Sequence, residues 1–509
     1  MDTILADAAQ LNDVLLATDE SEYDNVALHV LQALRKFQTP DQTILLTVSL
    51  APMLLESIDP VSLTIPYVYL LHSLLESTIK ANHSSSRSLP QALLPDGQLW
   101  PAVTAGLLAF DPIQMRYVGP QLVKIVEVVY SGAEQTSNFV PAIQLLQNLI
   151  LRLDPQCCTL STTHYYYVKL CLYARAYTEA TNIIDFPIYH IPTSEATKTL
   201  EKRLGKYLCS QQESSLAYIN PQSGLSGKIT SRVYLEYYLL GALCYIGTEQ
   251  WKKAQAFLEI VLVAPTQQNV ASLIMLEAYK KWLLLGLIIK GQAPDLPRAM
   301  GANAAKHIRI LAKPYECVVD AFKTNKLEVL HAEIQEGLDI WQQEGNYGLM
   351  VEVSNAFRRF AVIRLSKMFA ALPIEEVAQR TSSSQPQDTQ ETLAYVQQLI
   401  STGELQATIT PSQTSGLGTV RFLPPTAAHK TEQEVEQEHR AKTIELKVLL
   451  KHISDYDHQL AANKDYVEWL TKLKKARDQD KKAADKGVKP LGGPPVPGDF
   501  PDEDMMDEW

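Results

Sequence analysis

The feature that most constrains this fold is a pair of helices joined by a tight turn, because one such hairpin cannot cover its own apolar faces. The segment Val233–Pro265, VYLEYYLLGALCYIGTEQWKKAQAFLEIVLVAP, predicts a helix, a turn at Gly247, a second helix and a proline stop. Tyr165–Asp185 predicts a second hairpin of the same kind. Since each hairpin leaves an apolar face uncovered until a neighbour stacks on it, several should form a right-handed solenoid.

The spacing within the first hairpin resembles that of a tetratricopeptide repeat. Gly241, Phe257 and Pro265 lie at the expected intervals, although the usual small residue is displaced to Ala254. The aromatic residues in these hairpins are more simply explained as core between stacked helices than as a peptide-binding groove. We therefore expect an all-α solenoid of tetratricopeptide-like repeats.

Downstream, the pattern predicts a different module. Two long helices are expected near Pro314–Gln343 and Tyr347–Leu372, followed by two shorter ones that begin at Leu372 and Asp388. Strict two-residue alternation then begins at Leu405, and a second short strand surrounds Arg421. Helices followed by a small β-hairpin are typical of a winged helix.

Many winged helices bind DNA through their last helix, but the charge here argues against it. Between Thr381 and Thr410 there are three acidic residues and no Lys or Arg, which gives a local charge of −3. The outer strand of a hairpin can instead pair with another polypeptide through its free backbone groups. The residues that we expect to bind a partner at the hairpin are Leu405, Ile409, Val420, Arg421 and Phe422.

A long charged helix is predicted after the hairpin, with apolar residues at heptad spacing and one polar position, Asn463. This seam could fold back on the solenoid or insert into a multi-helix bundle with other subunits, and its narrowness favours the bundle. The seam residues that we expect to bind partners are Leu446, Leu449, Ile453, Tyr456, Leu460, Val467 and Leu470. The final stretch, DFPDEDMMDEW, is typical of a disordered acidic tail.

Composition and motifs give no indication of a catalytic or ligand-binding site. The net charge is −11 with a pI near 5.6, so no overall positive field would attract nucleic acid or an anionic membrane. No secretory signal and no transmembrane segment is predicted, so we expect a soluble intracellular protein. The six cysteines form no C-x-x-C pair, and no hydrolase, metalloprotease or nucleotide-binding motif is present. We expect no catalytic residues, no metal and no cofactor.

Several segments resemble a PCI domain, a module of the proteasome regulatory lid, the COP-nine signalosome and the third eukaryotic translation initiation factor. They are LSKMFAALPIEEVA (Leu365–Ala378), YVQQLISTGELQATI (Tyr395–Ile409) and TVRF (Thr419–Phe422). Two further segments, Glu344–Phe369 and Asp455–Lys472, are similar to a signalosome subunit of this family whose chain continues past the wing into a long helix.

The resemblance implies a non-catalytic scaffold in the assembly that removes the modifier Nedd8 from cullin-RING ubiquitin ligases. It implies partners that are other PCI-domain subunits and, in a helical bundle, MPN-domain subunits, in the cytoplasm and nucleus. An equivalent subunit of the proteasome lid, or a PCI subunit of messenger-RNA export or translation initiation complexes, is the alternative.

These patterns divide the chain into five segments. They are N-terminal helical repeats at 1–160, tetratricopeptide-like hairpins at 161–313, a PCI module at 314–425 (helical part 314–362, winged helix 363–425), a C-terminal bundle helix at 430–486 and an acidic tail at 487–509.

Overall fold

The structure of this chain is a computed structural model. It describes residues 5–9, 11, 20–36, 55–81, 88–192, 210, 215–265, 272–381, 389–410, 418–423, 432–462 and 471–472. The described residues fall into two compact units: the first ends at Val435, and the second contains the last helix from Glu436 onward.

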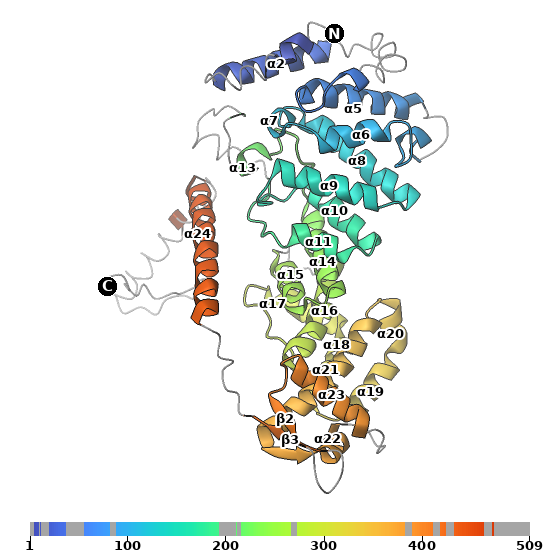
Figure 1. The fold of residues 1–509 in the computed structure, drawn as a ribbon, viewed down its shortest axis with the longest axis vertical. Coiled ribbons are helices and arrows are strands. Elements are labelled where there is room, and N and C mark those ends of the chain that lie inside the picture. The colour runs from blue at the N-terminus through green and yellow to red at the C-terminus, as the bar shows by residue number, and fades with distance from the viewer. Residues whose placement is uncertain are drawn as a thin grey trace, which may run out of the picture. The chain divides into compact units, whose positions relative to one another are not determined.

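The first unit is a succession of antiparallel helices, as the solenoid prediction required (Figure 1). Each helix packs on helices close to it in sequence, both its direct neighbours and helices one or two further along, so that α5 contacts α6 and α8, and α10 contacts α9, α11 and α14. Its helices down to the PCI region are α2 (Glu20–Lys36), α5 (Thr64–Ala81), η1 (Gln91–Leu93), α6 (Trp100–Leu108), α7 (Pro112–Met115), α8 (Gly119–Thr136), α9 (Val140–Leu153), α10 (Thr162–Tyr173), α11 (Tyr177–Ile184), α13 (Ser215–Tyr218), α14 (Ser231–Gly247), α15 (Trp251–Val263), α16 (Leu273–Lys290) and α17 (Ala302–Leu311).

Both predicted hairpins are present. Helices α10 and α11 form the first, and α14 and α15 form the second. In the second hairpin, the absence of a side chain at Gly241 lets the two helices approach, because a Cβ there would lie 2.8 Å from the Phe257 ring. The repeat spacing read from the sequence therefore marks a real packing contact.

The region after α17 departs from the prediction of one long helix near Pro314–Gln343. It contains three shorter helices, α18 (Lys313–Lys323), α19 (Leu327–Glu336) and α20 (Leu338–Gln343). The first break falls at Asn325, whose φ of 57° is left-handed, a conformation that a helix interior does not accept. The second falls at Gly337, which ends α19 and begins α20. The other predicted long helix is continuous, as α21 (Tyr347–Met368).

A small α/β unit follows, which we call the sheet module. It consists of the end of α21, β1 (Ala371–Pro373), α22 (Ile374–Thr381), α23 (Thr389–Ser401), β2 (Ala407–Thr410) and β3 (Thr419–Phe422). The strands form an antiparallel sheet in the order β1-β3-β2. The sequence predicted only β2 and β3, so β1 is an additional strand and β3 lies in the centre.

Buried apolar side chains form two clusters in the first unit, one in the solenoid and one in the sheet module. The change between them falls within α21, since Phe357 belongs to the solenoid cluster and Val362 to the module cluster. The module cluster consists of Val362, Leu365, Leu372, Ile374, Val377, Val396, Leu399, Leu405, Ala407, Val420 and Phe422. A single long helix therefore anchors the module to the solenoid.

The second unit contains α24 (Glu432–Ala462), the described part of the predicted C-terminal helix. The rest of that segment, apart from residues 471–472, and the acidic tail lie outside the described residues. Within the described ranges, no helix has both the length and the apolar content needed to span a bilayer.

Candidate assembly interface

The structure places the five predicted hairpin residues in different environments. Leu405, Val420 and Phe422 are buried in the module core, Ile409 is half-buried and Arg421 is exposed. The reason is the packing of the helices, because α21, α22 and α23 contribute side chains to the same core and cover this face of the sheet. In addition, β1 and β2 pair with the two backbone edges of β3. Leu405, Val420 and Phe422 therefore hold the module together and offer no free surface. Binding of a partner at this sheet stays a prediction, with its backbone edges as the remaining candidates.

Acidic residues beside the hairpin are paired with arginines of α21. Arg358 lies 3.4 Å from a carboxylate oxygen of Glu391 in α23, and Arg359 lies 3.4 Å from one of Glu404 in the turn before β2. Arg359 also donates a hydrogen bond to the carbonyl oxygen of Ile288 in α16. These contacts fasten the module to α21 and α16. Sequence reasoning missed them because the pairs are 33 and 45 residues apart.

The predicted helical seam is exposed where the structure describes it. The side chains of Leu446, Leu449 and Ile453 are 57%, 41% and 46% exposed. Tyr456 and Leu460 fall within α24, but their side chains are not among those described, and Val467 and Leu470 lie outside the described residues. Isolated apolar residues on a surface are ordinary, but a continuous apolar stripe along one helix marks an interaction site.

A second apolar stripe lies on the opposite side of α24. Ile444 is 65% exposed and Val448 is 43% exposed. At about 100° per residue, these two positions point about 100° to 180° away from Leu446, Leu449 and Ile453. A helix with apolar residues on two opposite sides needs cover on both. This pattern favours a place inside a bundle over pairing with a single helix.

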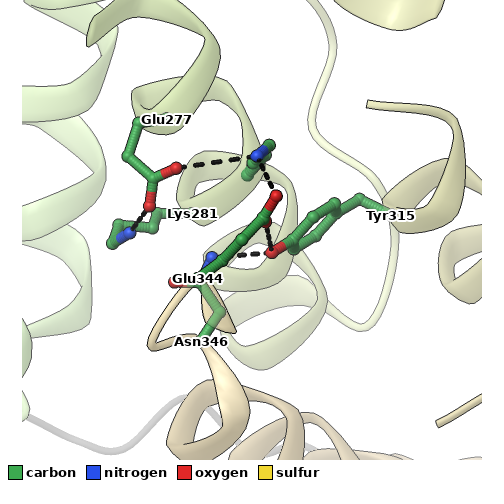
Figure 2. Close-up of polar contacts among 6 residues, drawn as sticks. Glu277, Lys281, Tyr315, Glu344 and Asn346 are labelled. Atoms are coloured by element: carbon green, nitrogen blue, oxygen red, sulfur yellow. Dashed lines mark hydrogen bonds and ion pairs between the residues drawn. The ribbon is translucent and has the colours of Figure 1, made fainter. Parts of the chain in front are cut away.

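A buried network of charged and polar side chains lies where the solenoid meets α21 (Figure 2). Lys280 and Lys281 of α16 are only 8% and 7% exposed. Lys280 donates a 2.6 Å hydrogen bond to Glu344, and Lys281 forms an ion pair with Glu277. Burying a lysine ammonium costs free energy unless an acidic group is paired with it, and Glu344 and Glu277 provide that pairing here.

The same network continues through a tyrosine to the first turn of α21. The Tyr315 hydroxyl donates to Glu344 across 2.5 Å and accepts from the Asn346 side-chain amide at 2.7 Å (Figure 2). Tyr315 belongs to α18, Glu344 follows α20, and Asn346 directly precedes α21. Four helices, α16, α18, α20 and α21, are therefore joined at one point, and this junction fixes where α21 begins.

The electrostatic environment of the junction favours the charged form of the Glu344 carboxylate. Burial by itself would raise the pKa of Glu344, but hydrogen bonds from Lys280 and Tyr315 outweigh it and lower that pKa. For Tyr315, burial and the neighbouring Glu344 raise the pKa of the phenol, so its hydroxyl stays a proton donor. The Glu344 carboxylate therefore stays charged and the Tyr315 hydroxyl stays protonated near neutral pH.

The described residues include no group of three or more His, Cys, Asp or Glu side chains arranged to hold a metal ion. Cys157, Cys158, Cys171 and Cys244 are buried free thiols, Cys317 is exposed, and Cys209 lies outside the described residues. Burial raises the pKa of the Cys157 thiol to about 12, which keeps it protonated and unreactive.

One family model and two known proteins that are similar to this chain all have descriptions that name COP9 signalosome complex subunit 3. A family model described as COP9 signalosome complex subunit 3, N-terminal helical repeats, matches residues 30–302, upstream of the PCI motifs. COP9 signalosome complex subunit 3 of Emericella nidulans is 31% identical over 381 residues, 75% of each chain. Its counterpart of the same name in Neurospora crassa is 27% identical over 424 residues, 82% of each chain. The chain therefore belongs to the COP9 signalosome complex subunit 3 family.

Proposed function

We propose that this chain is a non-catalytic scaffold subunit of the COP9 signalosome, within the assembly that removes Nedd8 from cullin-RING ubiquitin ligases. Its sheet module contacts other PCI-domain subunits, and α24 enters a helical bundle that includes MPN-domain subunits. It acts in the cytoplasm and nucleus. The two relatives described above are named as subunits of that complex, which supports this proposal.

The observation that carries the proposal is the exposed apolar seam of α24. Burying a leucine or isoleucine side chain contributes about 1.5–3 kcal/mol, so Leu446, Leu449 and Ile453 together would contribute about 5–9 kcal/mol. Hydrogen bonds at a sheet edge contribute about 0.5–1.5 kcal/mol each. The helix is therefore the larger contact, and the sheet module orients the chain within the assembly.

The test replaces Leu446 and Leu449 with aspartate in the full-length chain. Removing two leucine contacts costs at least about 3 kcal/mol, which is a hundredfold loss of affinity. Leu446→Asp/Leu449→Asp should therefore fail to co-purify with the other signalosome subunits. The matched control is Thr443→Asp/Ser454→Asp, which places aspartates at two exposed positions between the two apolar stripes and should co-purify normally. Equal recovery of both double variants would refute the proposal.

A further inference from the structure

Helix α10 has aromatic side chains in two different environments. Tyr167 is fully buried in the solenoid core. Tyr165 and Tyr166 are only partly buried, and Tyr173 is 45% exposed. Tyr165, Lys169 and Tyr173 follow one another at intervals of four residues, so they lie on the same face of the helix. Stacking of the hairpins therefore covers one face of α10 and leaves another face partly open.

The open face of α10 belongs to a cluster of rings, which we call the aromatic patch. The Tyr130 ring of α8 stacks on that of Tyr166 with 4.6 Å between the ring centroids. The centroids of Tyr165 and Tyr166 are 5.7 Å apart, and Phe139, which directly precedes α9, lies 6.1 Å from Tyr173. The aromatic patch consists of Tyr130, Phe139, Tyr165, Tyr166 and Tyr173. Accessible aromatic side chains are enriched in protein–protein interfaces, often as the residues that contribute most to binding.

Lys169 lies among the rings of the aromatic patch. Its ammonium nitrogen is 5.3, 5.7 and 5.8 Å from the ring centroids of Tyr130, Tyr165 and Tyr173. Cation–π attraction to these rings holds the ammonium in place. However, no carboxylate of the residues that the structure describes forms an ion pair with it. The partly buried charge of Lys169 therefore has no counter-ion within that part of the chain.

The acidic side chains beside the aromatic patch are bonded to other groups. Glu236 accepts a 2.7 Å hydrogen bond from the Tyr165 hydroxyl. Glu134 accepts one of 3.3 Å from the Tyr130 hydroxyl. By contrast, the two buried lysines of the junction described above each have an acidic partner. Because withdrawing a charge from water costs free energy unless it is paired, we expect another molecule to provide the counter-ion of Lys169.

Two hydroxyl groups of the aromatic patch, those of Tyr166 and Tyr173, also have no hydrogen-bond partner among the described residues. A phenol hydroxyl can donate one hydrogen bond, and an ammonium donates up to three and accepts none. The patch thus combines a cation with two further O–H donors. A carboxylate matches this set, because its two oxygens accept several hydrogen bonds at once.

The apolar surface beside Lys169 favours a polypeptide over a small anion. Val140 is 57% exposed and is next to Phe139, whose ring lies beside that of Tyr173. An inorganic anion bound at Lys169 would leave these side chains in water. A polypeptide segment with an apolar residue beside its acidic residue would cover them and the ammonium together. Nucleic acid fits less well, because one cation without a counter-ion neutralises too few phosphates.

We propose that the aromatic patch is a docking site for an acidic segment of another subunit of the complex. An aspartate or glutamate of that segment pairs with Lys169, and an apolar side chain next to it packs against Val140 and Tyr173. This inference rests on the proposed function, and it adds an interface on the solenoid to those of the sheet module and α24.

Zero-length carbodiimide crosslinking of the purified complex tests the ion pair, because the reagent joins an ammonium only to a carboxylate in direct contact. Lys169 should be joined to an aspartate or glutamate of another subunit. Lys290, an exposed lysine at the end of α16 to which we assign no partner, should not be. If the chain co-purifies but Lys169 forms only links within its own chain or none at all, the inference is wrong and the proposed function stands. If the chain does not co-purify with the other subunits, both fail.

Substitutions of Lys169 give a second readout, the hydroxyl-radical labelling of Tyr173 in the isolated chain and in the complex. Assembly should lower this labelling several-fold in the unmodified chain and in Lys169→Arg, which keeps the positive charge. The protection should be lost in Lys169→Glu and largely lost in Lys169→Met, which keeps an apolar stem over the rings and so preserves the fold of α10. Equal protection in Lys169→Met and Lys169→Arg would overturn the proposal. So would equal protection of Tyr173 in the isolated chain by inorganic phosphate, which would mark a site for small anions only.

Discussion

Replacing Tyr315 with phenylalanine removes one oxygen atom from the buried junction beneath α21. The lost hydroxyl donates to the Glu344 carboxylate, and a hydrogen bond to a charged group is worth about 1.5–3 kcal/mol. Its loss also leaves the Asn346 amide, which is fully buried, without the acceptor it has at 2.7 Å, at a cost of about 1–3 kcal/mol. Tyr315→Phe should therefore destabilise the first turn of α21 by about 3–5 kcal/mol.

The matched control is Tyr279→Phe, which removes an equally buried hydroxyl. Tyr279 donates to Glu316 at 2.5 Å, and the Glu316 side chain is 31% exposed, close to the 30% of Glu344, so water can replace each lost carboxylate bond in part. Only Tyr315→Phe also removes the acceptor of the buried Asn346 amide. We expect a cost of about 1–2 kcal/mol. The assay is native-state hydrogen exchange of the α21 amides, because a chain of this size need not unfold in one step. An equal or smaller effect of Tyr315→Phe would refute the role given to the junction.

Two further predictions concern pH and a close backbone contact. Burial lowers the pKa of His164 to about 4, from 6.5 in an unfolded chain, so the unfolded state binds the proton more readily between these values. The free energy of opening, measured by native-state hydrogen exchange of the α10 amides, should fall by about 3 kcal/mol as the pH drops from about 6.5 to about 4, and the dependence should be flatter in His164→Gln. In the same assay on the amides beside each glycine, Gly291→Ala should cost at least about 1 kcal/mol more than Gly345→Ala, about the energy of one steric clash. Both glycines have φ of 68°, but only at Gly291 would a Cβ meet a ring, that of Phe360 at 2.8 Å; equal costs would contradict this.

The helical hairpins could be predicted from sequence because their signal is local. Apolar residues recur at helical spacing, and the turn and stop residues lie within the same thirty or so positions. The additional strand β1 could not be predicted in this way, since three residues that end in Pro373 have no measurable period. Leu405, Val420 and Phe422 were assigned to a surface because their burial depends on the tertiary packing of α21, α22 and α23 on one face of the sheet, which a local pattern does not show.

The buried junction was also missed, although the sequence contains a trace of it. Lys280 and Lys281 lie within LIMLEAYKKWLLLGLIIK, an otherwise strongly apolar helix. Two lysines in such a helix require acidic partners elsewhere, which periodicity within one helix does not identify. Glu344 comes 64 residues after Lys280, and only the packing of α16, α18 and α20 brings the two together.

Hydroxyl-radical footprinting of the native complex tests the scaffold role most directly, because it reports the exposure of individual side chains without any substitution. Labelling of Leu446, Leu449 and Ile453 should fall several-fold between the isolated chain and the complex. Leu311, an exposed residue of α17 to which we assign no partner, serves as the reference and should label equally in both. Undiminished labelling of all three seam residues in the intact complex would contradict the account.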